Sequence, residues 1–240
     1  SEILLPTSIT SISFSCFRAC EKLTSILLPT NITTIEQYAF SGCAGLTELI
    51  IPSGVTAIEQ YAFYGCSGLT ELTIPSSVTT IDGTALSGCS GLKELVFEDS
   101  DIPLVFPNGE YDTATDILKK YVNGESVRYQ IKYYKSPFSK YPIEKLYIGR
   151  NLSDKSRYNI NGDGGMDPYV ITSYDAPFCD LPNLKELVIG ENVTVLGPNQ
   201  DYISEVDLKI TPGSFKNCST IRTVEVKSSI PPTGAEFSTT

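Results

Sequence analysis

A gapless internal repeat constrains the fold of this chain more than any other feature. Blocks 23–45, 46–68 and 69–91 of the 240-residue chain align without a gap, so the period is 23 residues. Residues 1–22 fit the same template and lack only its first position. Repeats with periods of about 20 to 50 residues are typical of stacked coils, because one repeat cannot bury its own apolar faces. The sequence therefore predicts a solenoid in which each coil contacts only its neighbours.

The apolar positions within a repeat predict where its strand and its turns lie. Leu46, Leu49 and Ile51 have the L-x-x-L-x-L spacing of a short strand that turns apolar side chains inward. Pro52 then ends the strand, because proline has no N–H to donate. A small residue followed by a large one, as at 62–63, predicts a tight helical or 3₁₀ turn that plugs the end of the coil. Two further apolar columns are expected on the opposite wall: Ile9, Ile32, Val55 and Val78, and Ile12, Ile35, Ile58 and Ile81.

The repeat loosens after residue 91 but does not stop. Segments 92–97, 143–148, 184–189 and 221–226 are four more strands of the same type, and their starts are 51, 41 and 37 residues apart. Insertions of 28, 18 and 14 residues therefore lie between these coils. With a first strand at 2–5, we expect eight coils in a single domain, residues 1–240. Its parts are regular repeats (1–97), a Tyr/Lys-rich insertion (98–142) and irregular repeats with further insertions (143–240).

The block L-x-x-L-x-I-P-x-x-V-x-x-I-x-x-x-A-F-x-x-C resembles the repeat of the BspA-like leucine-rich repeat family, of the Treponema-pallidum-type class. Residues 69–91 match it nearly throughout, except that Leu86 replaces the usual phenylalanine. Segments 92–101, 142–153 and 183–196 resemble the irregular repeats of such proteins, and 228–237 resembles their closing repeat. The resemblance covers essentially the whole chain. It implies an α/β leucine-rich-repeat solenoid, mostly β with short helical or 3₁₀ turns and about eight short parallel strands on a concave face.

The same resemblance implies a class of function. Members of the family are secreted or outer-surface proteins of host-associated bacteria that adhere to host proteins or to other cells. The motif defines architecture, so no functional residues carry over with it. The N-terminus lacks the basic region and long apolar stretch of a signal peptide, and the chain starts partway through a repeat. We expect a piece of a longer extracellular or surface protein, with leader and anchor outside this piece.

Composition excludes several other classes of function. The chain has no His, so it has no Ser-His-Asp triad, no Cys-His pair and no imidazole-ligated zinc. Its formal charge of −10 disfavours nucleic acid, and no apolar run approaches the ~20 residues that cross a bilayer. Acid pairs such as Asp99 and Asp101 leave glycoside hydrolysis as a token alternative. We therefore predict a non-enzymatic protein without cofactor, nucleic acid or transmembrane segment.

Four cysteines recur at the repeat interval: Cys20, Cys43, Cys66 and Cys89. One metal ion needs ligands around it at ~2.3 Å, whereas stacked coils place these thiols in a line. Neighbouring Cβ atoms would lie ~4.8 Å apart, beyond the ~3.5–4.5 Å of a disulfide. We predict a buried ladder of free thiols and no metal site, with Cys16, Cys179 and Cys218 continuing it less regularly. Residues 159–167 partly imitate a calcium loop, but its closing acid is Val170, so a polar turn is favoured.

Alternate strand positions should face outward on the concave sheet. They form an acidic column of Glu2, Glu48, Glu71, Glu94 and Glu186 beside an apolar column of Leu4, Leu27, Ile50, Val96, Tyr147 and Val188. One interpretation is a solvated acidic face that maintains solubility. The other is a protein-binding surface, because like charges ~4.8 Å apart repel unless a partner compensates. The candidate binding residues are Leu27, Glu48, Ile50, Glu71, Glu94, Val96, Tyr147 and Glu186.

A second candidate surface lies in the long insertion. Residues 119–157 contain ten of the 18 basic residues and three acids, a net +7, whereas the rest of the chain has eight basic and 25 acidic residues. Tyrosine is a rigid amphipathic anchor, so this segment could bind an anionic glycan or an acidic protein. Its candidate residues are Tyr129, Lys132, Tyr133 and Tyr134. Alternatively, the insertion folds onto the acidic coils and pairs its lysines there. A passive spacer that displays another domain is a third possibility.

Overall fold

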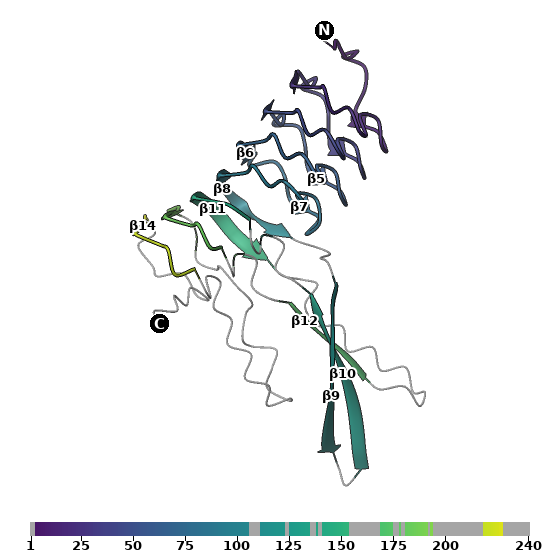
Figure 1. Ribbon diagram of the computed structural model, residues 1–240, viewed down its shortest axis with the longest axis vertical. Coiled ribbons are helices and arrows are strands. Elements are labelled where there is room, and N and C mark those ends of the chain that lie inside the picture. Colours follow the sequence, from purple (N-terminus) through teal and green to yellow (C-terminus); the bar gives the residue numbers. More distant parts are fainter. Residues whose placement is uncertain are drawn as a thin grey trace.

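The chain forms a stack of coils from which a separate small sheet projects (Figure 1). The computed structural model describes residues 3–105, 111–122, 125–134, 138, 141–153, 169–174, 178, 181–191, 193 and 218–227. For 111–122, 125–134, 152–153 and 169–174 it describes the backbone without the side chains. The described part contains strands and turns only, so the regular structure is entirely β.

Two rows of parallel strands follow the stack. The first row, which we call the first ladder, consists of the pair β2 (Ser25–Ile26) and β4 (Glu48–Leu49), followed by β6 (Glu71–Ile74), the first residues of β8 (Glu94–Val105), β11 (Lys145–Ser153), β13 (Glu186–Ile189) and β14 (Thr223–Val226), which pair in that order. The second ladder consists of β1 (Ser11–Ile12), β3 (Thr34–Ile35), β5 (Ala57–Ile58) and β7 (Thr80–Ile81). Strand β8 joins the two, because Glu94 pairs with Glu71 while Val105 pairs with Thr80. The predicted parallel solenoid is confirmed.

The core between the two ladders is built from the predicted columns. Leu46, Leu49 and Ile51 point inward from the first ladder, and Ile35 and Ile58 from the second, all at most 7% exposed. Successive phenylalanines stack from coil to coil, with ring centroids 5.2 Å apart for Phe17–Phe40 and 5.7 Å for Phe40–Phe63. The apolar repeat therefore becomes one continuous core.

The turn that closes each coil is not helical, and this part of the prediction is wrong. Within 38–43, the N–H groups of Ala39, Ser41 and Cys43 donate to the carbonyl three residues back, which makes successive tight turns. Tyr38 and Gly42 have φ of 58° and 78°, and Tyr61 and Gly65 repeat this one coil later at 55° and 70°. A left-handed residue interrupts any right-handed helix.

These left-handed residues create a third row of hydrogen bonds between coils. The N–H groups of Tyr38, Phe40 and Gly42 donate to the carbonyls of Gln60, Ala62 and Tyr64 in the next coil, at 3.1, 2.7 and 2.6 Å. A non-glycine left-handed residue costs roughly 1–2 kcal/mol. The inter-coil bonds offset this cost, because they satisfy backbone groups that the turn would otherwise bury unpaired.

The predicted first strand at 2–5 is not formed in the described residues. Residues 3–5 have no strand structure, and Leu4 is 80% exposed. Glu2 lies outside the described part, as do the calcium-like segment 159–167 and Cys179.

The insertions form a three-stranded sheet of β9 (Tyr111–Val122), β10 (Glu125–Tyr134) and β12 (Tyr169–Tyr174). Strands β9 and β10 are an antiparallel hairpin, and β12 pairs with β10 in parallel. This sheet extends away from the coils (Figure 1). The expectation that the insertion folds back onto the acidic coils is therefore wrong for its described backbone.

Candidate binding surface

The first ladder presents its alternate side chains to solvent, as predicted. In β6, Glu71 and Thr73 are exposed while Leu72 and Ile74 are buried. We call the outward side chains of this ladder the strand surface. Its apolar column is most exposed at the N-terminal coils, where Leu27 is 74% and Ile50 is 67% exposed. Thr73 interrupts the column, and the apolar side chains that follow it are half-buried: Val96, Tyr147 and Val188.

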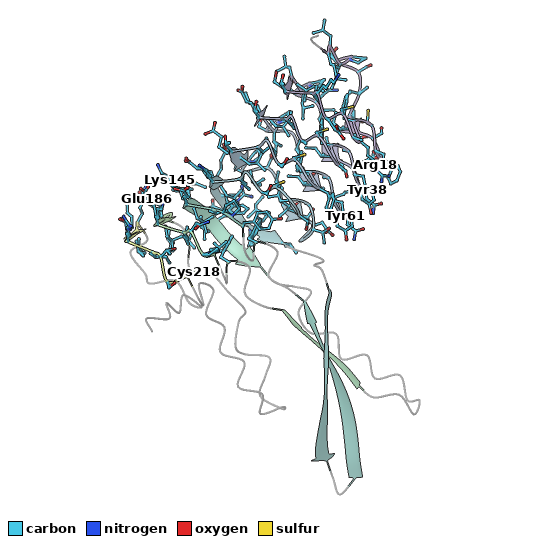
Figure 2. The ribbon with its side chains drawn as sticks, viewed as in Figure 1. Arg18, Tyr38, Tyr61, Lys145, Glu186 and Cys218 are labelled. Carbon is cyan, nitrogen blue, oxygen red and sulfur yellow. The ribbon has the colours of Figure 1, made fainter. Side chains whose placement is uncertain are left out.

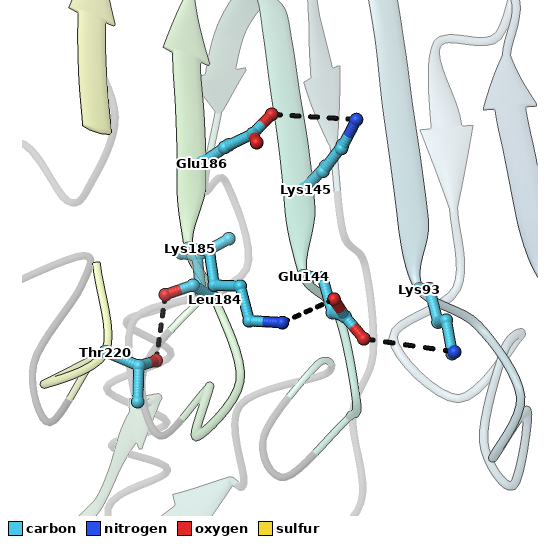
Figure 3. Close-up of polar contacts among 7 residues, drawn as sticks. All are labelled: Lys93, Glu144, Lys145, Leu184, Lys185, Glu186 and Thr220. Atoms are coloured by element: carbon cyan, nitrogen blue, oxygen red, sulfur yellow. Dashed lines mark hydrogen bonds and ion pairs between the residues drawn. The ribbon is translucent and has the colours of Figure 1, made fainter. Parts of the chain in front are cut away.

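The acidic column divides into an unpaired part and a paired part. Register places Lys145 between Glu94 and Glu186, and its Nζ lies 3.7 Å from Glu186 Oε2 (Figure 3). Within the predicted acidic column, Glu186 therefore has a compensating charge, because a lysine of the intervening coil pairs with it. Glu48, Glu71 and Glu94 make no such ion pair within the part of the chain that the structure describes.

A second row of alternating charges lies beside this pair. Lys185 Nζ donates to Glu144 Oε2 at 2.7 Å, and Lys93 Nζ lies 3.9 Å from Glu144 Oε1 (Figure 3). The Lys185 hydrogen bond and charge, with a smaller contribution from Lys93, lower the pKa of the Glu144 carboxyl. Within the described part of the chain, Glu144 and Glu186 of the C-terminal coils are thus paired with lysines, whereas Glu48, Glu71 and Glu94 are not.

A shallow groove of about 350 Å³ lies where the unpaired acids and the apolar column meet. The exposed or half-buried side chains that line it are Glu48, Ile50, Ser53, Glu71, Thr73, Glu94, Val96 and Glu98. Five of the eight predicted binding residues thus border one concavity. A further groove lies towards the N-terminal coil, where Lys22 and Leu27 join Glu48 and Ile50. Acidic and apolar side chains thus meet in the first groove, and Lys22 adds a positive charge to the second.

Tyr147, another predicted binding residue, is held by neighbours. Its hydroxyl donates to the carboxylate of Asp99, with distances of 2.8 and 2.9 Å to the two oxygens. Desolvation and the Asp99 hydrogen bond raise the pKa of Tyr147 to about 12. The Lys227 ammonium lies 5.5 Å from the ring centroid. Asp99 is thus engaged with a tyrosine, which gives no support to its use in glycoside hydrolysis.

The basic segment does not form one patch in the structure. Lys145 and Arg150 belong to β11 within the stack, and Arg150 is fully buried. Lys119 and Lys120 lie in β9, and Arg128 and Lys132 in β10. The backbone also places Tyr129, Tyr133 and Tyr134 in β10, paired with Tyr169, Ser173 and Tyr174 of β12, but their side chains lie outside the described part. The second candidate surface therefore stays a prediction.

Arg150 was not identified from the sequence as structural. Its guanidinium donates from Nε to Glu98 O at 3.0 Å, from Nη1 to Ser76 O and Val78 O at 3.2 and 2.6 Å, and from Nη2 to Pro75 O at 2.6 Å. Burial lowers the pKa of Arg150, and the charges of Glu98 and Asp99 oppose that shift. The side chain joins the fourth regular coil to the first irregular one.

An aromatic row with exposed surface was also not identified from the sequence. It lies on the side of the stack that the coil turns form, which we call the turn wall. Tyr38 and Tyr61 stack at 5.2 Å, Phe14 meets Tyr38 edge-on at 6.0 Å, and the Arg18 guanidinium lies 5.4 Å from the Tyr38 centroid. In Figure 2, Arg18, Tyr38 and Tyr61 lie on the opposite side of the stack from Lys145 and Glu186. The 23-residue spacing of Tyr38 and Tyr61 is the signal that would have indicated the row.

The predicted buried cysteine ladder is confirmed at three of its four repeat positions, whereas Cys20 is only half-buried. Cys43, Cys66 and Cys89 have no exposed surface, and each thiol donates to the phenylalanine carbonyl of the preceding coil at 3.0, 3.1 and 3.2 Å. Cys218 donates in the same way to Phe178 O at 3.2 Å, whereas Cys16 is exposed. Burial raises the pKa of Cys43 to about 11 and of Cys89 to about 12. Among the described residues, no cluster of His, Cys, Asp or Glu is arranged to hold a metal.

With the repeat geometry established, the comparisons with known proteins give the family. The model of the BspA type leucine-rich repeat region matches residues 1–103 in six copies. These residues belong to the BspA type leucine-rich repeat family. No curated protein matches the chain. Within the described ranges, the chain has no helix with the length and hydropathy of a membrane span.

Three solved leucine-rich repeat structures are similar to the chain. The leucine-rich repeat protein of T. pallidum is 17% identical, with a TM-score of 0.46, and the match covers 96% of this chain and 70% of that one. A leucine-rich cell surface protein of Faecalibacterium prausnitzii A2-165 is 20% identical, with a TM-score of 0.36 and coverages of 90% and 62%. A leucine-rich repeat protein of Bacteroides ovatus ATCC 8483 is also 20% identical, with a TM-score of 0.36 and coverages of 94% and 60%. The chain thus spans between 60% and 70% of the lengths of these three.

Proposed function

We propose that this chain is a non-catalytic binding module at a bacterial cell surface, and that it recognises a protein of the host or of a neighbouring cell through the strand surface. The exposed Ile50 beside the unpaired Glu48 and Glu71 is the observation that carries this proposal. Contiguous exposed apolar patches that are rimmed by polar residues mark protein-interaction sites. Stacked repeats also expose extended surfaces that such proteins use for binding.

The extracellular or outer-surface location is part of the same proposal. It is supported by the BspA type repeats and by the cell surface description of the Faecalibacterium prausnitzii protein. The absence of catalysis is proposed because the chain has no His and because the acids of the groove lie beside apolar residues on an open surface. Turnover of a glycoside or peptide substrate by the pure protein would contradict it.

The test is capture of protein partners by immobilised chain, using matrix proteins and surface extracts of neighbouring bacteria. Ile50→Asp places a charge in the groove and should abolish capture, while Ile102→Asp is the matched control. Ile102 is also exposed, at 56%, but does not line the groove. Equal loss with both variants, or with neither, would argue against the strand surface.

The glycan alternative is tested separately. Binding to a glycan array that is lost with Tyr129→Ala or Lys132→Glu, and retained with Ile50→Asp, would assign binding to the insertion instead. Absence of binding in both experiments would favour a passive spacer.

A further inference from the structure

Two rows of side chains on the strand surface run along the axis of the stack. The acidic row is Glu48, Glu71 and Glu94, one from each of three successive coils. The second row lies two residues further along each strand and consists of Ile50, Thr73 and Val96. Both rows line the same groove of about 350 Å³. A partner that fills this groove therefore contacts a line of carboxylates and a parallel line of mainly apolar groups.

The charges of this surface favour a basic partner. The next acid along the ladder, Glu186, is neutralised by Lys145, and Glu144 is bonded by Lys185. Glu48, Glu71 and Glu94 make no ion pair among the described residues, although Lys145 lies in register beside Glu94. Like charges on adjacent parallel strands repel, and ammonium or guanidinium groups of a partner would relieve that repulsion.

The spacing of the rows constrains the conformation of the partner. Adjacent coils are about 4.8 Å apart, so three carboxylates span roughly 9.6 Å. On an α-helix, one face repeats every three or four residues, and a first, fourth and eighth residue span about 10.5 Å. An extended chain that uses every second residue spans about 13 Å for the same three contacts. The three contact residues of a helix laid along the stack therefore span the three carboxylates with a mismatch of about 1 Å. Those of an extended segment overshoot the third carboxylate by about 3 Å.

We propose that the occupant of this groove is an amphipathic α-helix of a partner protein, with Lys or Arg in one stripe and apolar side chains in the next. The basic stripe lies over Glu48, Glu71 and Glu94, and the apolar stripe lies over Ile50 and Val96. This inference rests on the proposed function and adds the chemistry and conformation of the bound segment. A segment that ran along a single strand would meet only one member of each row.

The test uses two synthetic peptides of the same composition. Each is long enough for about four turns of α-helix. Lysine occupies every third or fourth position, and leucine occupies the neighbouring stripe. One is held helical by a hydrocarbon staple, and the other carries proline substitutions that prevent a helix. Binding is measured by isothermal titration calorimetry at low and high salt.

The protein variants are the triple substitution E48Q, E71Q and E94Q, and the control E59Q. Glu59 lies on the turn wall and accepts the Gln37 N–H, a bond that a glutamine oxygen can keep.

The stapled peptide should bind at least about tenfold more tightly than the proline peptide. The triple variant should weaken it by about tenfold, since each exposed ion pair contributes up to about fivefold, and high salt should weaken it similarly. E59Q should leave binding unchanged. Equal binding of the two peptides, equal binding to the triple variant, or no binding of either would overturn the inference. If a protein partner is captured through Ile50 but the stapled peptide fails, the proposed function stands and the helix does not. If the stapled peptide binds as expected but no protein is captured in a way that depends on Ile50, the proposed function alone is overturned.

Discussion

Replacement of Arg150 tests whether one buried side chain joins the regular coils to the irregular ones. Arg150 has no exposed surface, and its guanidinium makes four hydrogen bonds, all to backbone carbonyls. Three of the carbonyls belong to the turn 75–78 and the fourth belongs to Glu98 in β8. Arg150→Met keeps most of the side-chain volume and removes every one of these donors.

The size of the effect follows from two opposing contributions. A buried carbonyl that loses its hydrogen-bond donor costs about 1–3 kcal/mol of stability. Four such carbonyls would therefore lower the free energy of unfolding substantially if nothing offset the loss. Removal of the charge also removes its desolvation cost, which is several kcal/mol for a buried ion. We therefore expect Arg150→Met to lower the free energy of unfolding by about 3 kcal/mol, the part of the carbonyl loss that the relief of desolvation does not offset.

Urea denaturation followed by circular dichroism measures this change. The control is Lys22→Met, which removes an exposed basic residue and should alter the free energy of unfolding by less than about 0.5 kcal/mol. A change for Arg150→Met as small as that of the control would refute the structural role. It would instead indicate that Arg150 belongs to an exposed basic patch, as the sequence alone suggests.

Three further predictions concern the coils. Phe63→Ala removes a fully buried ring stacked on Phe40 and should cost about 3–5 kcal/mol in urea denaturation, and a cost below 1 kcal/mol would contradict the continuous core. Gly65→Ala should cost roughly 1–2 kcal/mol in the same assay, because φ is +70° and the added Cβ meets no atom closer than 3.9 Å, so backbone strain acts alone. Burial raises the pKa of Cys43 from 9.0 to about 11, so the unfolded chain loses that proton first and the free energy of unfolding should fall between pH 9 and pH 11. Cys43→Ala should make this fall shallower, and an unchanged slope would count against the buried thiol.

The stacked architecture could be predicted from the sequence because its determinants recur at one interval. Every regular repeat has an apolar residue at the positions equivalent to Leu49 and Ile58. Periodicity alone therefore places these two positions on the two inward walls. The turn could not be predicted in the same way. Its conformation depends on left-handed Tyr38 and Tyr61, and tyrosine carries no local signal for positive φ. Inter-coil hydrogen bonds, which the local sequence does not show, hold it there.

The binding surface shows the same division between local and distant information. The exposure of Ile50 and Glu71 follows from strand alternation, so the residues of the groove could be proposed from the sequence. The strands identified at 143–148 and 184–189 also place Lys145 beside Glu186, and the structure confirms that register, but the ion pair was not predicted because charge counting assigned Lys145 to the basic segment. Arg150 was assigned to a basic segment by charge counting, which contains no information on burial.

Hydrogen exchange with a captured protein partner bound tests the location of the binding surface most directly. Binding at the strand surface predicts slower amide exchange at 48–50, 71–73 and 94–96, with no change in the β9–β10 hairpin at 111–134. Protection confined to that hairpin, with unchanged exchange in the first ladder, would contradict it.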